Sequence, residues 1–278
     1  MICIFCGQKK APSKEHIIPK AICSKDAALI TKNVCHECNQ NLGKTIDSKF
    51  ANNSLIAMER LCLEQVGYKG KSKLPFNYLE DLNGNQIKIK KNKLEITPQV
   101  KQTGKNTFKI TAGTEEEAER IIKKKVKRIN QKYNINKFLK YTGNHSFISA
   151  KSELDLSDIE VEFLKIAFEY INLYYSDIYS KDPIGKELRN ILNKFKCGKK
   201  AFYSSYLVKL SKNKYSYFEN LSKSKNINYH SIFSINNSKN ELYINIFLFK
   251  GSHSYSVLVS KNGNLYPKLK ERHTLIRY

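Results

Sequence analysis

Two closely spaced cysteine pairs near the N-terminus constrain this chain more than any other feature. They are Cys3-x-x-Cys6 and Cys35-x-x-Cys38, and they hold four of the seven cysteines in a chain of 278 residues. Disulfide frameworks are typical of short, cysteine-dense chains, whereas repeated Cys-x-x-Cys pairs are typical of zinc sites. Each pair supplies two thiolates, and four thiolates complete the tetrahedral coordination of one zinc ion. The sequence therefore predicts one structural Zn²⁺ held by all four thiolates.

The segment between the two pairs is longer than in a minimal zinc ribbon and contains polar residues of its own. It carries Glu15-His16-Ile17-Ile18-Pro19, and Asn33 and Asn39 flank the second pair. Cysteine spacing alone leaves two interpretations open. The ribbon could serve only for stability or binding, or it could support a catalytic insertion.

The whole string of motifs resembles the zinc-knuckle branch of the HNH endonuclease family. The string runs over the first fifty residues and comprises the two cysteine pairs, Ser13 to Pro19, Asn33 to Asn39, Leu42-Gly43-Lys44 and Asp47. The resemblance implies a ββα-metal finger. It places strands near Glu15 to Pro19 and Leu29 to Cys35, and a helix that starts near Asn39.

The resemblance also implies a role for each polar residue of the string. His16 would be the general base, Glu15 and Asn39 would bind a catalytic divalent ion, and Asn33 would brace the loop that holds His16. Carboxylate and amide oxygens suit a hard ion such as Mg²⁺ or Mn²⁺, whereas thiolates suit zinc. An unperturbed histidine titrates near pH ~6.5, so its neutral form can accept a proton at neutral pH. Glu15 stands where the family often has Asp, and Asn39 where the family name promises a final His.

Two geometric expectations follow from spacing. Asn39, Gly43 and Asp47 are spaced i, i+4 and i+8, so a continuous helix would place Asp47 beside Asn39 as a further ligand. The alternative is that Asp47 is solvated or pairs with a lysine. Adjacent residues of a regular strand point to opposite faces, so Glu15 and His16 can approach one ion only at a bend.

The rest of the chain mixes helical and strand patterns, so the predicted fold class is α+β. We expect strands at 86–90, 108–111, 230–235, 241–250 and 253–260. Capping boxes of Thr114 with Glu117 and of Ser157 with Glu160 predict two helices, the first reaching about Tyr133 and the second packing on a core. A shorter helix is expected over 186–196. The predicted regions are the nuclease module 1–66, a small β-meander with a basic helix over 67–150, and an α+β region over 151–278.

The charge of the chain indicates a polyanionic partner. Lys and Arg total 49 against 25 acids, a formal net charge of +24, which favours nucleic acid. Codon bias toward Lys, Asn and Ile is the alternative cause. Between Arg120 and Lys140 nine Lys or Arg occur without an acid, which predicts a helix with either a phosphate-binding or a merely solvated face. The residues expected to contact phosphates are Lys44, Lys123, Lys124, Lys127 and Arg128.

Taken together, these patterns predict a metal-dependent endonuclease that hydrolyses DNA, expected to be double-stranded. No apolar run is long enough for a membrane span and no signal peptide is recognisable, so we expect a cytoplasmic protein without membrane association. An effector role in bacterial antiviral defence or restriction is compatible with this activity, with the C-terminal region sensing a partner or trigger. The alternative from another class is a zinc-ribbon nucleic-acid-binding protein without catalysis.

The basic segment gives a first testable prediction. Neutralising Lys123, Lys124, Lys127 and Arg128 together should weaken DNA binding, because each lost phosphate contact lowers the slope of log K against log salt by about 0.9 on duplex DNA. Losing two to four contacts should flatten the slope by roughly 2 to 4. Binding isotherms at several salt concentrations, in a catalytically dead His16→Ala background, measure this. An unchanged slope would identify the segment as a solvated face.

Overall fold

The computed structural model describes residues 1–23, 29–62, 78–81, 86–90, 93–103, 108–129, 148–151, 155–210, 229–269 and 272–277. The chain folds into two compact units, residues 1–73 with 154–278 and residues 74–153. The predicted N-terminal module and the predicted C-terminal region therefore share the larger unit. That unit also holds every predicted site residue except the four of the basic segment.

The N-terminal finger has the ββα order that the resemblance implies. Strand β1 (Pro12–His16) pairs antiparallel with β2 (Ile30–Cys35), and helix α1 (His36–Leu42) follows directly. The helix starts three residues earlier than expected because Cys35, still in extended conformation, is its N-cap. A short 3₁₀ turn, η1 (Lys20–Ile22), follows the Glu15 to Pro19 segment.

The helical run after α1 is interrupted twice. A π-helical turn, η2 (Gly43–Asp47), separates α1 from α2 (Ser48–Asn52), and the extended ψ of 135° at Asn53 separates α2 from α3 (Ser54–Cys62). A π turn contains more residues than an α turn. Asp47 is therefore displaced from the face of Asn39 on which an uninterrupted α-helix would place it.

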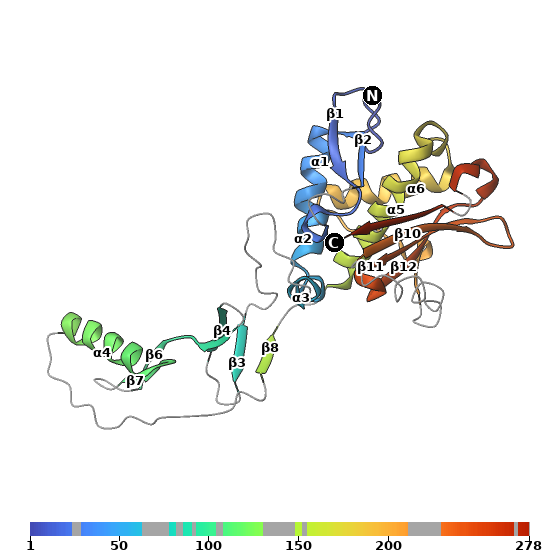
Figure 1. The fold of residues 1–278 in the computed structure, drawn as a ribbon. Coiled ribbons are helices and arrows are strands. Elements are labelled where there is room, and N and C mark those ends of the chain that lie inside the picture. Colours follow the sequence, from blue (N-terminus) through green and yellow to red (C-terminus); the bar gives the residue numbers. More distant parts are fainter. Residues whose placement is uncertain are drawn as a thin grey trace. The chain divides into compact units, whose positions relative to one another are not determined.

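The C-terminal part of the larger unit is a pair of helices on a five-stranded antiparallel sheet (Figure 1). The strand order is β13-β10-β11-β12-β9. Helices α5 and α6 pack against β12, and α5 also packs against β11. The element bounds are α5 Leu156–Tyr179, α6 Pro183–Lys196, η3 Ser204–Tyr206, β9 Leu207–Lys209, β10 Tyr229–Asn236, β11 Leu242–Leu248, η5 Phe249–Gly251, β12 His253–Ser260, η6 Gly263–Leu265, η7 Pro267–Leu269 and β13 His273–Arg277.

Helix α5 lies at the centre of this unit. It was expected to begin at a capping box of Ser157 with Glu160, and this was wrong. Asp155 is the N-cap, and its Oδ1 accepts a hydrogen bond from the Ser157 backbone N–H at 2.9 Å. Glu160 instead accepts a hydrogen bond from the Tyr203 hydroxyl at 2.8 Å. Asp is an equally good cap, and here it stands two residues earlier.

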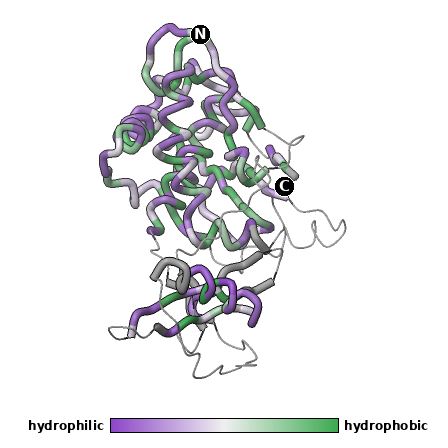
Figure 2. Tube along the Cα trace, turned by 90° about the vertical axis from the view of Figure 1, so that its left-hand side faces the viewer, coloured by the Kyte–Doolittle hydropathy of each residue, from purple (hydrophilic) through white to green (hydrophobic). Residues whose placement is uncertain are grey.

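One hydrophobic core joins the finger to the C-terminal part. It includes Phe5 and Val34 of the finger together with Phe163 and Phe168 of α5, and the rings of Phe5 and Phe168 lie 5.2 Å apart. Helix α5 contacts both β2 and the η2 turn. Figure 2 shows hydrophobic and hydrophilic residues intermixed along the chain of the larger unit, and α5 is buried on all sides from Val161 to Asn172. The finger therefore depends on α5 for part of its core.

In the described residues of the smaller unit, strands are combined with one helix. Its sheets have the orders β5-β4-β3-β8 and β6-β7. The bounds are β3 Tyr78–Asp81, β4 Gln86–Lys90, β5 Lys93–Ile96, β6 Gln99–Gln102, β7 Phe108–Thr111, α4 Glu115–Ile129 and β8 Ile148–Lys151. The Thr114 cap is confirmed, since its hydroxyl accepts from the Glu117 N–H at 3.2 Å. The expected end of this helix near Tyr133 lies outside the described residues.

The observed mixture of helices and strands confirms the α+β class. Among the helices that the structure describes, none has both the length and the apolar character needed to cross a bilayer.

A buried aspartate ties α6 to the sheet. Asp182 is the N-cap of α6, and its Oδ1 accepts from the N–H groups of Ile184 and Gly185 at 2.8 and 3.3 Å. Its Oδ2 accepts from the hydroxyls of Ser260 and Tyr266 at 2.6 and 2.8 Å. This carboxylate therefore holds the start of α6 against the end of β12.

Removing this carboxylate should destabilise the larger unit more than removing an exposed cap. Asp182→Ala leaves four buried donors without their charged acceptor and should lower the free energy of unfolding by about 3 kcal/mol or more. The matched variant Asp155→Ala removes the exposed cap of α5 and should cost about 1 kcal/mol. Urea denaturation followed by circular dichroism measures both. Equal losses of unfolding free energy in the two variants would show that the hydrogen bonds from Ser260 and Tyr266 add no stability beyond that of a helix cap.

Candidate functional site

The four paired cysteines come together at one point. Their Sγ atoms all lie within 4.8 Å of one another, and those of Cys6 and Cys35 are 3.9 Å apart. Tetrahedral Zn²⁺ with bonds of about 2.3 Å requires sulfur atoms about 3.8 Å apart. The donors therefore fit zinc in both chemistry and spacing. Within the described ranges, no other group of three or more His, Cys, Asp or Glu side chains is close enough to hold a metal ion.

The first knuckle is shaped by its own backbone. Gly7 adopts a φ of +70°, a conformation that favours glycine, and its N–H donates to the Cys3 carbonyl at 2.8 Å. The Cys35 N–H donates to Cys3 Sγ at 3.4 Å. Burial raises the pKa of Cys3, but hydrogen bonds from backbone N–H groups outweigh it and lower this pKa to about 7. The backbone thus favours the thiolate that zinc requires.

Helix α6 braces the zinc knuckles through three side chains that the sequence analysis did not single out. Arg189 Nε donates to the Ile4 carbonyl at 2.7 Å, and Asn193 Nδ2 donates to the Phe5 carbonyl at 2.9 Å. Lys196 Nζ lies 3.4 Å from Cys38 Sγ. The spacing i, i+4 and i+7 places all three on one face of the helix. Helical spacing predicts that the three residues share a face, but the sequence does not show that this face contacts the cysteine pairs.

Glu15 and His16 share strand β1 but differ in their surroundings. Glu15 pairs with Thr31 and His16 with Ile30, whereas Ser13 pairs with Val34, so β2 carries one extra residue in a bulge before the two. Glu15 is buried and only 2% exposed, while His16 is half-buried. This agrees with the alternation of side chains along a strand. The bulge lies before the pair, so Glu15 and His16 face opposite sides of the hairpin.

The two asparagines bind backbone carbonyls of other elements. Asn39 Nδ2 donates to Ser13 Oγ at 2.6 Å and to the Lys14 carbonyl at 2.9 Å, which joins α1 to the strand that carries His16. Asn33 Nδ2 donates to the Asn172 carbonyl at 3.1 Å. The Asn33 contact joins β2 to α5, and the brace between Asn33 and the loop that holds His16 stays a prediction.

A buried cluster of charges lies behind Glu15. Lys165 of α5 is fully buried, and its Nζ lies 2.8 Å from Asp47 Oδ1 and 3.0 Å from Glu15 Oε1. It also lies 3.6 Å from Glu162 Oε1 and 3.8 Å from Glu169 Oε2. These contacts are ion pairs rather than well-aligned hydrogen bonds. Asp47 thus pairs with a lysine, the alternative to metal binding that its sequence left open.

Protonation must relieve part of the charge in this cluster. Burial raises the pKa values of Glu15, Glu162 and Glu169 despite the nearby ammonium. Burial lowers the pKa of Lys165, but the carboxylates, Asp47 first, outweigh it and raise this pKa well above its ordinary value. A charged lysine is therefore shared among carboxyl groups that keep some of their protons.

The finger with this geometry was compared with known proteins. Residues 3–55 match the HNH endonuclease family. This HNH module includes both zinc knuckles, β1, β2 and the helical run through α2. The remaining residues lie outside the match. No curated protein and no solved structure matches the chain.

Two of the residues expected to bind the catalytic divalent ion of the HNH module, both carboxylates, do not fit such an ion as they are placed. Glu15 and Asp47 both lie against the Lys165 ammonium, which already supplies a positive charge. The Nδ2 of Asn39 donates to Ser13 Oγ and to the Lys14 carbonyl, whereas a divalent ion would take the oxygen of this amide. The two carboxylates converge on the Lys165 ammonium, and that charge would repel a divalent cation placed there.

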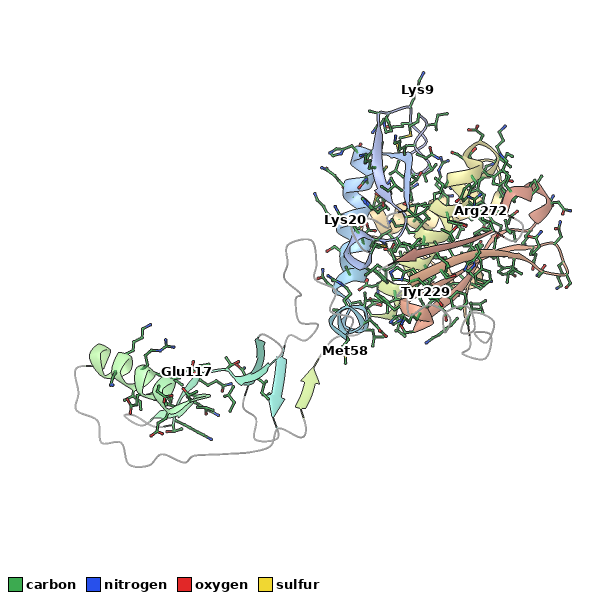
Figure 3. All side chains as sticks on the ribbon, in the orientation of Figure 1. Lys9, Lys20, Met58, Glu117, Tyr229 and Arg272 are labelled. Carbon is green, nitrogen blue, oxygen red and sulfur yellow. The ribbon has the colours of Figure 1, made fainter. Side chains whose placement is uncertain are left out.

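His16 lies among basic residues on the outer side of the HNH module. Burial, followed by the charges of Lys20 and Lys165, lowers the pKa of His16 below its usual value, so the ring is neutral at pH 7. Lys14 and Lys32 are exposed on the two strands of the hairpin. Lys20 is exposed just after the strand and is labelled in Figure 3. Of these three lysines, Lys20 is the one whose charge lowers the pKa of His16.

Of the five residues predicted to contact phosphates, the structure describes the side chains of three. Lys44 is exposed on the η2 turn. In the smaller unit Lys123 and Lys124 are exposed on α4, and Lys123 Nζ lies 3.3 Å from Glu119 Oε2. The side chains of Lys127 and Arg128 lie outside the described residues.

The four-cysteine site leads to a prediction about zinc binding and folding. Cys35→Ser should abolish zinc binding and unfold the HNH module, because structural zinc sites of this kind are worth roughly 10 kcal/mol or more. Cys197→Ser, which changes an exposed cysteine outside the site, should retain one equivalent of zinc. Elemental analysis and circular dichroism measure both variants. A full equivalent of zinc in Cys35→Ser would contradict the four-thiolate site.

Proposed function

We propose that this protein is an HNH endonuclease that hydrolyses phosphodiester bonds of double-stranded DNA, with His16 as the general base. The observation that carries the proposal is the position of His16 within the family match. It is a half-buried histidine of lowered pKa at the end of β1, and the ββα finger around it is held by a four-thiolate site.

The residues around His16 suit the chemistry of phosphodiester hydrolysis. The neutral imidazole takes a proton from water as the water oxygen bonds to phosphorus in line with the departing 3′ oxygen. The bond from phosphorus to this oxygen breaks, and the oxygen takes a proton from solvent. Lys14, Lys20 and Lys32 supply positive charge for the phosphate oxygens. The products carry 5′-phosphate and 3′-hydroxyl ends.

Dependence on Mg²⁺ or Mn²⁺ is also part of the proposal, on the strength of the family resemblance alone. Glu15 and Asp47 both lie against the Lys165 ammonium, so as placed these two carboxylates do not provide a site for the ion. Assays with each metal, and with a chelator, test the requirement directly.

The remainder of the chain supports a broader role. Most residues lie outside the match, including the five-stranded sheet and the smaller unit. We propose that these parts recognise DNA or sense a partner, and that the protein acts in the cytoplasm as an effector of antiviral defence or restriction. The net charge of +24 favours a nucleic-acid partner for the whole chain.

The rival proposal is a zinc-ribbon protein that binds nucleic acid without cutting it, and His16 separates the two. Plasmid DNA is incubated with the full chain and Mg²⁺ or Mn²⁺ under single-turnover conditions. His16→Ala should lower the cleavage rate by about 10² to 10⁴-fold, the usual contribution of a general base. Zinc content and DNA affinity should be unchanged, because His16 is neither a zinc ligand nor one of the residues expected to contact phosphates.

His36→Ala is the matched control. This exposed histidine lies between two zinc ligands, and its Nε2 is 2.9 Å from Gln40 Nε2. The variant should cut at close to the wild-type rate. Unimpaired cutting by His16→Ala would refute His16 as the base, and a wild-type protein that binds DNA but never cuts it would favour the rival.

A further inference from the structure

The buried ammonium of Lys165 joins two separate parts of the chain. Its two closest carboxylates come from the HNH module, Glu15 from β1 and Asp47 from the η2 turn. The two more distant ones, Glu162 and Glu169, come from its own helix. The shorter contacts therefore run between α5 and the module rather than within α5.

The energetics of this cluster argue against a role in stability alone. Removing charges from water costs several kcal/mol per ion, and apolar residues of similar volume often stabilise a core equally well. Buried charges are nevertheless retained where they specify one arrangement of the parts they join. Here the joined parts are the strand that carries His16, the turn after α1, and α5.

The other polar contacts between α5 and the module lie farther from His16 in the chain. Asn33 Nδ2 binds the Asn172 carbonyl at 3.1 Å, and Asn53 Nδ2 binds the Asp155 carbonyl at 2.8 Å. Lys165 binds Glu15, the residue next to His16. Because Glu15 and His16 are joined by one peptide bond, this contact lies one residue from the imidazole ring.

We propose that Lys165 is a positioning residue for the HNH site, because its ammonium holds Glu15 and Asp47 and thereby sets the place of His16. The inference rests on the proposed function in that His16 is taken as the base. It assigns Glu15 and Asp47 to the support of the site, and it makes a residue far outside the family match necessary for activity.

The test compares two variants of the full chain. The control is Glu162→Gln with Glu169→Gln, which keeps the size of both side chains and leaves Lys165 with its two closest partners. The test variant adds Lys165→Met, which keeps an apolar stem but removes the cation. For both we measure zinc content, circular dichroism, DNA affinity, the single-turnover rate at saturating DNA, and the NMR resonances of the His16 ring.

We expect the control to cut at nearly the wild-type rate. The triple variant should keep its zinc and its DNA affinity but cut about 10²-fold more slowly, the cost of misplacing a reacting group by about 1 Å. The His16 resonances should move in the triple variant alone. Equal rates and equal His16 resonances in the two variants, whether the rates are fast or slow, overturn the proposal.

Asp47→Asn keeps the proposal testable if the triple variant fails to fold. Asp47 is partly exposed, and the substitution removes the charge at the shortest Lys165 contact without changing size. It should slow cutting and move the His16 resonances. An unchanged rate with unchanged resonances overturns the proposal.

The NMR measurement separates this inference from the proposed function. A wild-type protein that cuts no DNA with either metal would refute the nuclease activity. The His16 resonances of the control and triple variants would still show whether Lys165 positions the ring.

Discussion

A buried ammonium group lies where the strand end of the N-terminal finger meets α5. Lys165 is fully buried, and its closest partners, Glu15 and Asp47, belong to a finger encoded more than a hundred residues earlier. A charge in this position is tolerated only while its carboxylates surround it, because a buried ion without a partner is strongly destabilising. The ion pairs therefore favour one relative position of the strand, the π turn and α5, and His16 is the last residue of that strand.

The two C-terminal helices support opposite ends of the finger. Helix α6 holds the zinc knuckles through Arg189 and Asn193, and α5 holds the strand end through Lys165. Asp182 in turn holds α6 against the sheet. The family match ends at residue 55, yet one hydrophobic core continues from Phe5 through Phe168. The HNH module is thus built into a larger unit whose other strands and helices complete its packing.

Local patterns predicted local structure well where the cause is local. The spacing of the cysteine pairs predicted that the four thiols come together, and the strand patterns over 230–260 located β10, β11 and β12. Sequence patterns failed to predict the N-cap of α5, where more than one residue could cap the helix, and the position of Asp47. Asp155 rather than Ser157 caps α5, and a π turn displaces Asp47 from the face of Asn39. Both outcomes depend on packing around the helix, which local propensity does not describe.

By itself the sequence determined the thiolate ligands, the order of strands and helix in the finger, the family resemblance and the α+β class, since each depends on residue type and short spacing. The tertiary structure alone decided what Glu15 and Asp47 contact. Oxygen donors near a histidine suggested a divalent ion, and only the folded chain shows that Lys165 lies between them. The physical reason is that a carboxylate binds whichever cation is brought to it, and a contact between distant segments depends on how the core packs.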